Sequence, residues 1–346
     1  YKMNTTLNNI IITTIHCSLY RFSGLILLLT SFINLFISCR YFINRYFNKT
    51  KHFIINRTSP IIIGMLFSSI LVIFTAVPLV IIQCFTCHAY LSYEIICTIH
   101  GFVCFSAGLF NMYIVALLSF SRYLSILHKR SWLNRLLEQH YDLNVLYCAL
   151  LAICWTLPPV FGIGNKYVRE GVGFYCSLNW KDPSIYSRIY LISVIFFNYF
   201  IPLILLLYSN LRVYFTLHYL LKLSKSSKYI SLSKTHSQSK NSIMNDRISL
   251  DIDLNRCLPD IRLEETTNRL QRLKIDRRYA LITAMIAAQY LITWTPYTFV
   301  EGLNVIGQNT FIQRNPFLPT LCGLLAKLSL ILNPLILIYS NKMTET

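Results

Sequence analysis

The stretch IICTIHGFVCFSAGLFNMYIVALLSF, residues 95–120, contains no Lys, Arg, Asp or Glu. A helix needs about 20 apolar residues to cross the roughly 30 Å of hydrocarbon in a bilayer, so this stretch predicts a membrane-spanning helix. The composition agrees, because 54% of the 346 residues are hydrophobic, only 13% are charged, and the mean hydropathy is +0.49. Such a chain is too apolar for a soluble domain of this size.

Six further apolar runs of comparable length follow the same pattern. Five carry no charge, and the last carries one lysine, Lys327. The runs are 22–39, 60–82, 143–164, 189–211, 279–300 and Asn315–Asn341. Only helices and closed barrels satisfy the backbone in lipid, and continuous apolar runs, without polar alternation, exclude a barrel. The sequence therefore predicts an all-α membrane protein, a seven-transmembrane helix bundle.

The distribution of the net charge of +18 predicts the topology. The segment between the first two runs is basic and has no acid, whereas the segment 83–94 has no Lys or Arg. The basic residues are Arg40, Arg45, Lys49, Lys51 and Arg57. Cytoplasmic loops are rich in Lys and Arg, so we expect the N-terminus, residues 1–21, to be extracellular. The protein is then a multi-pass protein of the cell membrane.

The region 22–341 is expected to form the membrane domain, interrupted by a long third cytoplasmic loop at about 220–273. This loop is rich in Ser and Lys and poor in aromatic residues, which predicts disorder. Its basicity fits the anionic inner leaflet of the bilayer better than a nucleic acid. Only residues 342–346 follow the last run, and the chain starts with Tyr, so a truncated gene product remains open.

Eleven cysteines are an odd number, so they cannot all pair. Cys97 and Cys176 both fall on the predicted outer, oxidising side, where a disulfide can hold the outer loop over the bundle. Cys84 and Cys87 form a single CxxC pair, which is too little for a metal site.

Helix-kinking motifs occur in a recognisable order. Trp294-Thr295-Pro296-Tyr297 stands in the sixth run, Asn333-Pro334 in the seventh, and Pro202 in the fifth. Ser121-Arg122-Tyr123 ends the third run, about 37 Å of helix beyond Cys97. Together with Asn34 in the first run, this set resembles the rhodopsin-like (class A) G-protein-coupled receptors across nearly the whole chain.

Lys327 stands six residues before Asn333-Pro334, which resembles the opsins, where this lysine binds retinal as a Schiff base. Removal from water favours the neutral amine, which can attack an aldehyde, and an apolar polyene needs a dry pocket. A lysine can also snorkel to the interface, but Lys327 lies near mid-bilayer, where a charge is costly. A lysine facing a water-filled transport path is the other alternative.

The resemblance also implies a counterion for a protonated Schiff base. Many opsins carry an acid on helix 3, three residues after the disulfide cysteine, but here that residue is His100, which cannot supply a negative charge. The second opsin site is a glutamate six residues before the loop cysteine, which is Glu170. The plain alternative is that Glu170 is a solvated loop acid paired with Arg169.

The remaining pocket residues are carried over from the opsins by position. Trp294 and Tyr297 would flank the polyene, Tyr290 would lie near the ionone ring, and Gly108 would leave room for that ring. Tyr199, three residues before Pro202, would close the pocket. Core packing is the alternative for each, because aromatic residues at helical spacing usually belong to a core.

The cytoplasmic half departs from the receptor pattern. Ser121 replaces the acid that normally precedes Arg122, although Asp276 at the inner end of helix 6 can still pair with that arginine. The tyrosines expected in helices 5 and 7 are displaced by two residues, to Tyr208 and Tyr339. These changes leave retinal binding intact but weaken the expectation of G-protein coupling.

Two functions follow from the resemblance. The first is a light-sensing opsin, a non-enzymatic receptor in which photoisomerised retinal moves helix 6 about Pro296 and admits a heterotrimeric G protein. The second is a retinal photoisomerase of the retinochrome type, which binds all-trans retinal and releases the 11-cis form; His100 and Ser121 resemble that group. A receptor for a diffusible ligand would leave Lys327 without a role.

Overall fold

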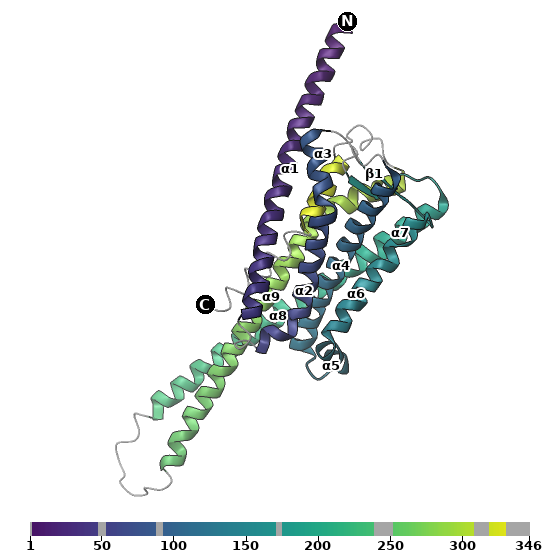
Figure 1. Cartoon of the computed structure of the whole chain (residues 1–346). Helices are drawn as coiled ribbons and strands as arrows, with labels where there is room; N and C mark the ends of the chain where they lie inside the picture. The colour runs from purple at the N-terminus through teal and green to yellow at the C-terminus, as the bar shows by residue number, and fades with distance from the viewer. Residues whose placement is uncertain are drawn as a thin grey trace.

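The computed structural model describes residues 2–47, 53–87, 93–170, 175–238, 252–307 and 318–329. Helices run side by side in an elongated bundle, and a two-stranded hairpin lies at the end that also holds α3 (Figure 1). The elements in chain order are α1 (Lys2–Phe47), α2 (Phe53–Thr75), α3 (Val77–Thr86), α4 (Glu94–Leu127), α5 (Trp132–Gln139), α6 (Tyr141–Thr156), η1 (Pro158–Phe161), β1 (Tyr167–Glu170), β2 (Tyr175–Leu178), α7 (Ile185–Ile195), η2 (Phe196–Phe200), α8 (Ile201–Gln238), α9 (Ile252–Ile306) and a last helix, Leu318–Ser329.

The apolar runs of the sequence coincide with helices. Within the described ranges, five helical stretches are long and apolar enough to cross a membrane. They are Tyr20–Ile43, Ile63–Thr86, Glu94–Leu127, Tyr141–Phe161 and Ile185–Lys222. The sixth predicted run, 279–300, lies inside α9, and the seventh is described over Leu318–Ser329. Asn333 and Pro334 lie outside the described residues.

Prolines account for three differences between the predicted and observed helix boundaries. The second run divides at Ala76 into α2 and α3, because Pro78 supplies no N–H to the preceding turn. In the fourth run, helix α6 ends at Thr156 and not at Gly164, since Pro158 and Pro159 start a short 3-10 turn there. In the fifth run, π-helix η2 directly precedes Pro202.

Three helices extend beyond the bundle (Figure 1). The N-terminal part of α1 projects at one end, and the joined ends of α8 and α9 project at the other. Helix α8 reaches Gln238 and α9 starts at Ile252, so helix occupies much of the segment 220–273 for which the sequence predicts disorder. Leu, Lys and Arg in this segment are good helix formers. Residues 239–251 of the predicted loop lie outside the described residues.

Helix α4 is the central element of the bundle. It contacts α2, α6, α8, α9 and both strands. A buried core joins α2, α4, α8 and α9 through Met65, Ile114, Leu206 and Ile286, which are at most 1% exposed. Large apolar side chains such as Phe36 point outward, as expected of helices that are solvated by lipid and held together by close packing.

Candidate functional site

The β-hairpin covers one end of the bundle and is anchored to α4. A disulfide joins Cys97 in α4 to Cys176 in β2, the pair that the sequence predicts. In the antiparallel register, Arg169 faces Cys176 and Glu170 faces Tyr175. Residues directly opposite each other in such a pair point to the same face, so Glu170 and Tyr175 are presented together, and both are buried.

Lys327 lies against this hairpin. Its Nζ atom is 3.5 Å from the centroid of the Tyr175 ring, a cation–π geometry. The Tyr175 hydroxyl donates a hydrogen bond of 2.7 Å to the carbonyl oxygen of Pro319, which is on the same helix as the lysine. The ring passes over Gly323, where a Cβ atom would overlap the hydroxyl group. The glycine therefore permits the tyrosine to reach the lysine.

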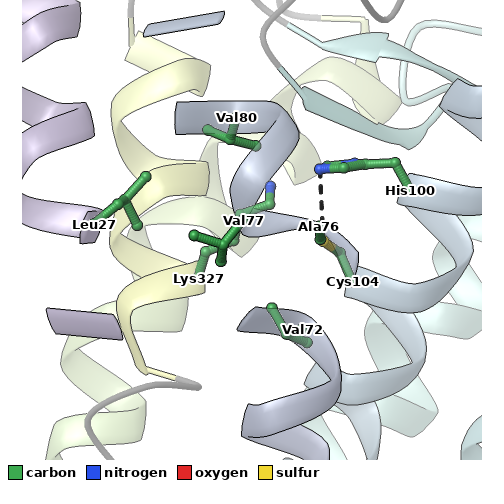
Figure 2. Close-up of a pocket in the computed structure, with 8 residues that line it drawn as sticks. All are labelled: Leu27, Val72, Ala76, Val77, Val80, His100, Cys104 and Lys327. Carbon is green, nitrogen blue, oxygen red and sulfur yellow. Dashed lines mark hydrogen bonds between the residues drawn. The ribbon is translucent and has the colours of Figure 1, made fainter. Parts of the chain in front are cut away.

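A small cavity lies on the other side of the lysine. Lys327 is partly buried and faces His100 and Cys104 of α4 across this cavity (Figure 2). The remaining walls are apolar and come from α1, α2, α3 and the turn between α2 and α3. They are Leu27, Val72, Ala76, Val77 and Val80. The amine thus meets aliphatic side chains and an aromatic ring, an environment suited to an apolar ligand.

His100 is held in one orientation by two neighbours. Its Nδ1 atom accepts a bond of 3.4 Å from the backbone N–H of Cys176, and its Nε2 atom lies 3.9 Å from the Cys104 sulfur. In a neutral imidazole one nitrogen accepts and the other carries the proton. The proton therefore belongs on Nε2, which leaves His100 uncharged beside Lys327.

Glu170 is buried, with 7% of its surface exposed, whereas Arg169 is exposed. Successive residues of a strand point to opposite faces, so the alternative that Glu170 is a solvated acid paired with Arg169 is wrong. One carboxylate oxygen accepts a bond of 3.2 Å from the Tyr297 hydroxyl, which itself accepts one of 3.2 Å from Trp180 Nε1. Glu170 faces Tyr175 in the hairpin, and the Lys327 amine lies over the ring of that same tyrosine.

The predicted aromatic residues gather around Trp294 of α9. Tyr290 stacks on its indole at 5.4 Å between ring centroids, and Tyr297 meets it edge to face at 6.2 Å. The indole N–H donates a bond of 2.7 Å to Ser329 on the last helix. Tyr199 belongs to the same cluster and bonds to Thr295 at 2.7 Å.

Gly108 has a different neighbour from the one that the sequence suggests. The sequence predicts space for the ionone ring at this position, and in the structure a Cβ atom at Gly108 would lie 2.7 Å from the Trp294 ring. The indole itself occupies the space that the missing side chain leaves.

Three features of the site were missed. Tyr175 adjoins a predicted disulfide cysteine, a position that carries no signal of its own. Glu301 is 1% exposed in α9, one helical turn after Tyr297; an acid at the border of an apolar run is the available signal. A second disulfide joins Cys87 to Cys17, and Cys84 of the CxxC pair is a buried free thiol.

The residues proposed for signalling are only partly described. Tyr123 is buried, bonds through its hydroxyl to His128 at 3.1 Å, and packs on Tyr208 at 5.6 Å. Asn210 donates to Ser119 at 3.2 Å.

On the first helix, the buried Asn34 accepts a bond of 3.2 Å from Ser38. Arg122 lies in α4 and is partly buried. The backbone of Asp276 lies in α9, but its side chain is outside the described part of the structure, so its pairing with Arg122 stays a prediction.

Comparisons with known proteins agree on one family. Residues 45–337 match the family described as "7 transmembrane receptor (rhodopsin family)". The "Rhodopsin, G0-coupled" of Mizuhopecten yessoensis is 27% identical over 248 residues, which are 71% of this chain and 51% of the relative. Human "Opsin-5" is 25% identical over 266 residues, 75% of this chain and 62% of the relative. The chain thus spans about half of the first relative and less than two thirds of the second.

The fold comparison points the same way. The crystal structure of squid rhodopsin superimposes with a TM-score of 0.70, covering 95% of this chain and 84% of that chain. At 20% sequence identity this likeness shows the fold. The predicted seven-transmembrane bundle is confirmed, and the protein is a multi-pass membrane protein.

Proposed function

The chain belongs to the rhodopsin family of seven-transmembrane receptors, and from this premise we propose that it is a light-sensing opsin with retinal attached to Lys327. The observation that carries the proposal is the environment of that lysine. Its amine lies inside the bundle against the Tyr175 ring and an apolar cavity. A free ammonium group is costly in such a place, whereas an amine that binds an aldehyde there has a chemical role.

The residues around Lys327 fit retinal in their chemistry. The lysine supplies an amine for the aldehyde end, the cavity walls are aliphatic, and aromatic residues line α9 next to it. When bound, retinal supplies absorption of light and a change of shape. Trp294 is packed between Gly108 of α4 and Ser329 of the last helix. A change in the shape of retinal beside Trp294 would therefore alter its contacts with both helices.

Glu170 is the proposed counterion. It is buried, it is oriented by the Tyr297 hydroxyl, and it faces Tyr175, whose ring the lysine amine contacts. His100 stands at the helix 3 position where many opsins carry the acid, but its imidazole is neutral here and accepts a hydrogen bond from the Cys176 backbone N–H. A buried carboxylate is therefore available where the histidine cannot serve.

The proposed output is coupling to a heterotrimeric G protein through movement of α9 about Pro296. Family membership supports such coupling in general. The displaced Tyr208 packs on Tyr123 next to Arg122, which keeps an aromatic residue of α8 at this end of the bundle. Retinal binding and coupling are separate parts of the proposal, and each has its own test.

The test of attachment is reconstitution of the expressed protein with 11-cis retinal. We expect a visible pigment from the wild type and none from Lys327→Ala. Lys129→Ala is the matched control, because Lys129 is exposed in the turn after α4 and should not affect the pigment. A visible pigment from Lys327→Ala would refute the attachment.

A retinal photoisomerase is the second candidate, favoured by the neutral His100 beside Lys327. Separate reconstitutions with 11-cis and all-trans retinal, followed by extraction after illumination, distinguish the two functions. A sensor should bind 11-cis retinal and stimulate nucleotide exchange on a G protein. Preferential binding of all-trans retinal, an 11-cis product and no exchange would favour the isomerase.

A further inference from the structure

A second buried carboxyl group lies next to the proposed counterion. Glu301 is 1% exposed, and one of its oxygens accepts a bond of 2.9 Å from the Asn304 amide. Its other oxygen, Oε1, has no hydrogen-bond partner within the described residues. Glu301 lies one helical turn after Tyr297, whose hydroxyl donates to Glu170.

Glu170 also has one carboxylate oxygen without a hydrogen-bond donor among the described residues. Its Oε2 atom accepts from Tyr297, while Oε1 is buried and has no partner within the described residues. The two carboxyl groups approach the same tyrosine, because the Tyr297 hydroxyl that bonds to Glu170 belongs to the helical turn directly before Glu301. Two buried carboxyl groups thus lie next to Tyr297, and each has one oxygen without a donor among the described residues.

Ionised carboxylates can only accept hydrogen bonds, and two of them in contact away from water repel each other strongly. A proton on one carboxyl group removes the repulsion and turns that group into a donor for the other. We propose that Glu170 and Glu301 share one proton and carry a single negative charge between them. The proton moves between carboxyl oxygens, and no other bond changes.

The groups facing the pair favour this charge of minus one. The cations near the pair are Lys181, in the loop after β2, and Lys327, on the last helix, whose amine lies over the Tyr175 ring opposite Glu170. The other titratable neighbours are neutral at pH 7: the phenols of Tyr175 and Tyr297, and the thiol of Cys322. Neither lysine completes a salt bridge with the pair, so full ionisation of both acids is not compensated.

The consequence for a pigment rests on the proposed function. With the proton on Glu301, Glu170 keeps its charge for the attached retinal. Glu301 is then a positioning residue, because it acts through Glu170. The shared proton itself is a property of the chain and needs no retinal.

The test is infrared spectroscopy of the full chain in lipid nanodiscs without added retinal. We expect one protonated-carboxyl carbonyl band that shifts in D₂O and is lost in both Glu301→Gln and Glu170→Gln, since the new amide donates to the remaining carboxylate. Glu94→Gln, at the exposed start of α4, should keep the band. Loss in the two variants together, and not in the control, identifies the pair.

A band that survives in Glu301→Gln would overturn the proposal, as would a wild-type spectrum without the band. Elution as a single folded species, checked for each variant, separates a lost proton from a lost fold, and Glu301→Asp should restore the band if Gln alone disturbs packing. Failure of the pair is distinguishable from failure of the proposed function, because pigment formation by the wild type and by Lys327→Ala is measured independently.

Discussion

Replacing Gly108 by alanine tests the packing at the centre of the site. The added Cβ atom would lie 2.7 Å from Trp294 Cη2 and 3.0 Å from Cζ2, whereas carbon atoms prefer about 3.5–4.0 Å. The indole must therefore move by about 1 Å. It is held by its bond to Ser329 and by the stacked Tyr290 ring, so the movement strains both contacts.

The expected cost follows from these contacts. Overpacking of a filled core costs about 1–3 kcal/mol, and weakening the indole hydrogen bond adds about 1 kcal/mol. The higher helix propensity of Ala compared with Gly stabilises the folded state by about 1 kcal/mol. We expect Gly108→Ala to lower the free energy of unfolding by about 1–3 kcal/mol. Gly302→Ala in α9, where the new Cβ atom meets nothing within 4 Å, should instead be neutral or stabilising.

The assay is thermal unfolding without retinal, followed by a thiol-reactive dye, since Cys104, Cys148 and Cys322 are buried free thiols that react on unfolding. A loss of 1–3 kcal/mol corresponds to several degrees in the unfolding midpoint. Equal midpoints for the Gly108 and Gly302 variants would refute the packing of Trp294 on Gly108. If the space belongs to the retinal ring instead, Gly108→Ala will reduce pigment yield but leave the retinal-free midpoint unchanged.

Two further predictions concern the outer end of the bundle. Cys87→Ser opens the disulfide to Cys17, which closes a loop of 70 residues. The free energy of unfolding should fall by up to about 4 kcal/mol, and the unfolding midpoint should fall more than in the control Cys84→Ser. Equal midpoints for the two variants would contradict a stabilising role for this bond. Glu170→Gln should leave an unprotonated, ultraviolet-absorbing pigment at neutral pH, while Arg169→Gln keeps visible absorption; an unchanged spectrum for Glu170→Gln would count against the counterion.

Much of the fold was predictable because one local property, a run of bilayer length with at most one charge, indicates each membrane-spanning helix. The errors lie where a proline acts within such a run. A hydropathy profile does not predict that Pro78 divides the second run or that Pro158 ends α6 in the fourth run. Both are backbone effects of a missing N–H and a fixed φ, and these prolines were visible in the sequence.

The site was predictable to the extent that it rests on spacing along one helix. Trp294, Tyr290 and Tyr297 do lie together, as their positions in one helix require. The occupant of the space at Gly108 depends on a partner helix, and no local pattern reports it. Glu301 was missed for the same reason, since an acid at the border of an apolar run has the same sequence pattern whether water or a β-hairpin covers it.

The hairpin register decides the chemistry next to Lys327. The Cys97–Cys176 disulfide fixes β2 on α4, which directs the adjacent Tyr175 to the lysine and sets Glu170 opposite that tyrosine. A slip of one residue in β1 would exchange the faces of the strand and turn Arg169 inward in place of Glu170. The buried charge would then change sign. Because a cation cannot serve as a counterion, the disulfide supports the proposed function through the register that it imposes.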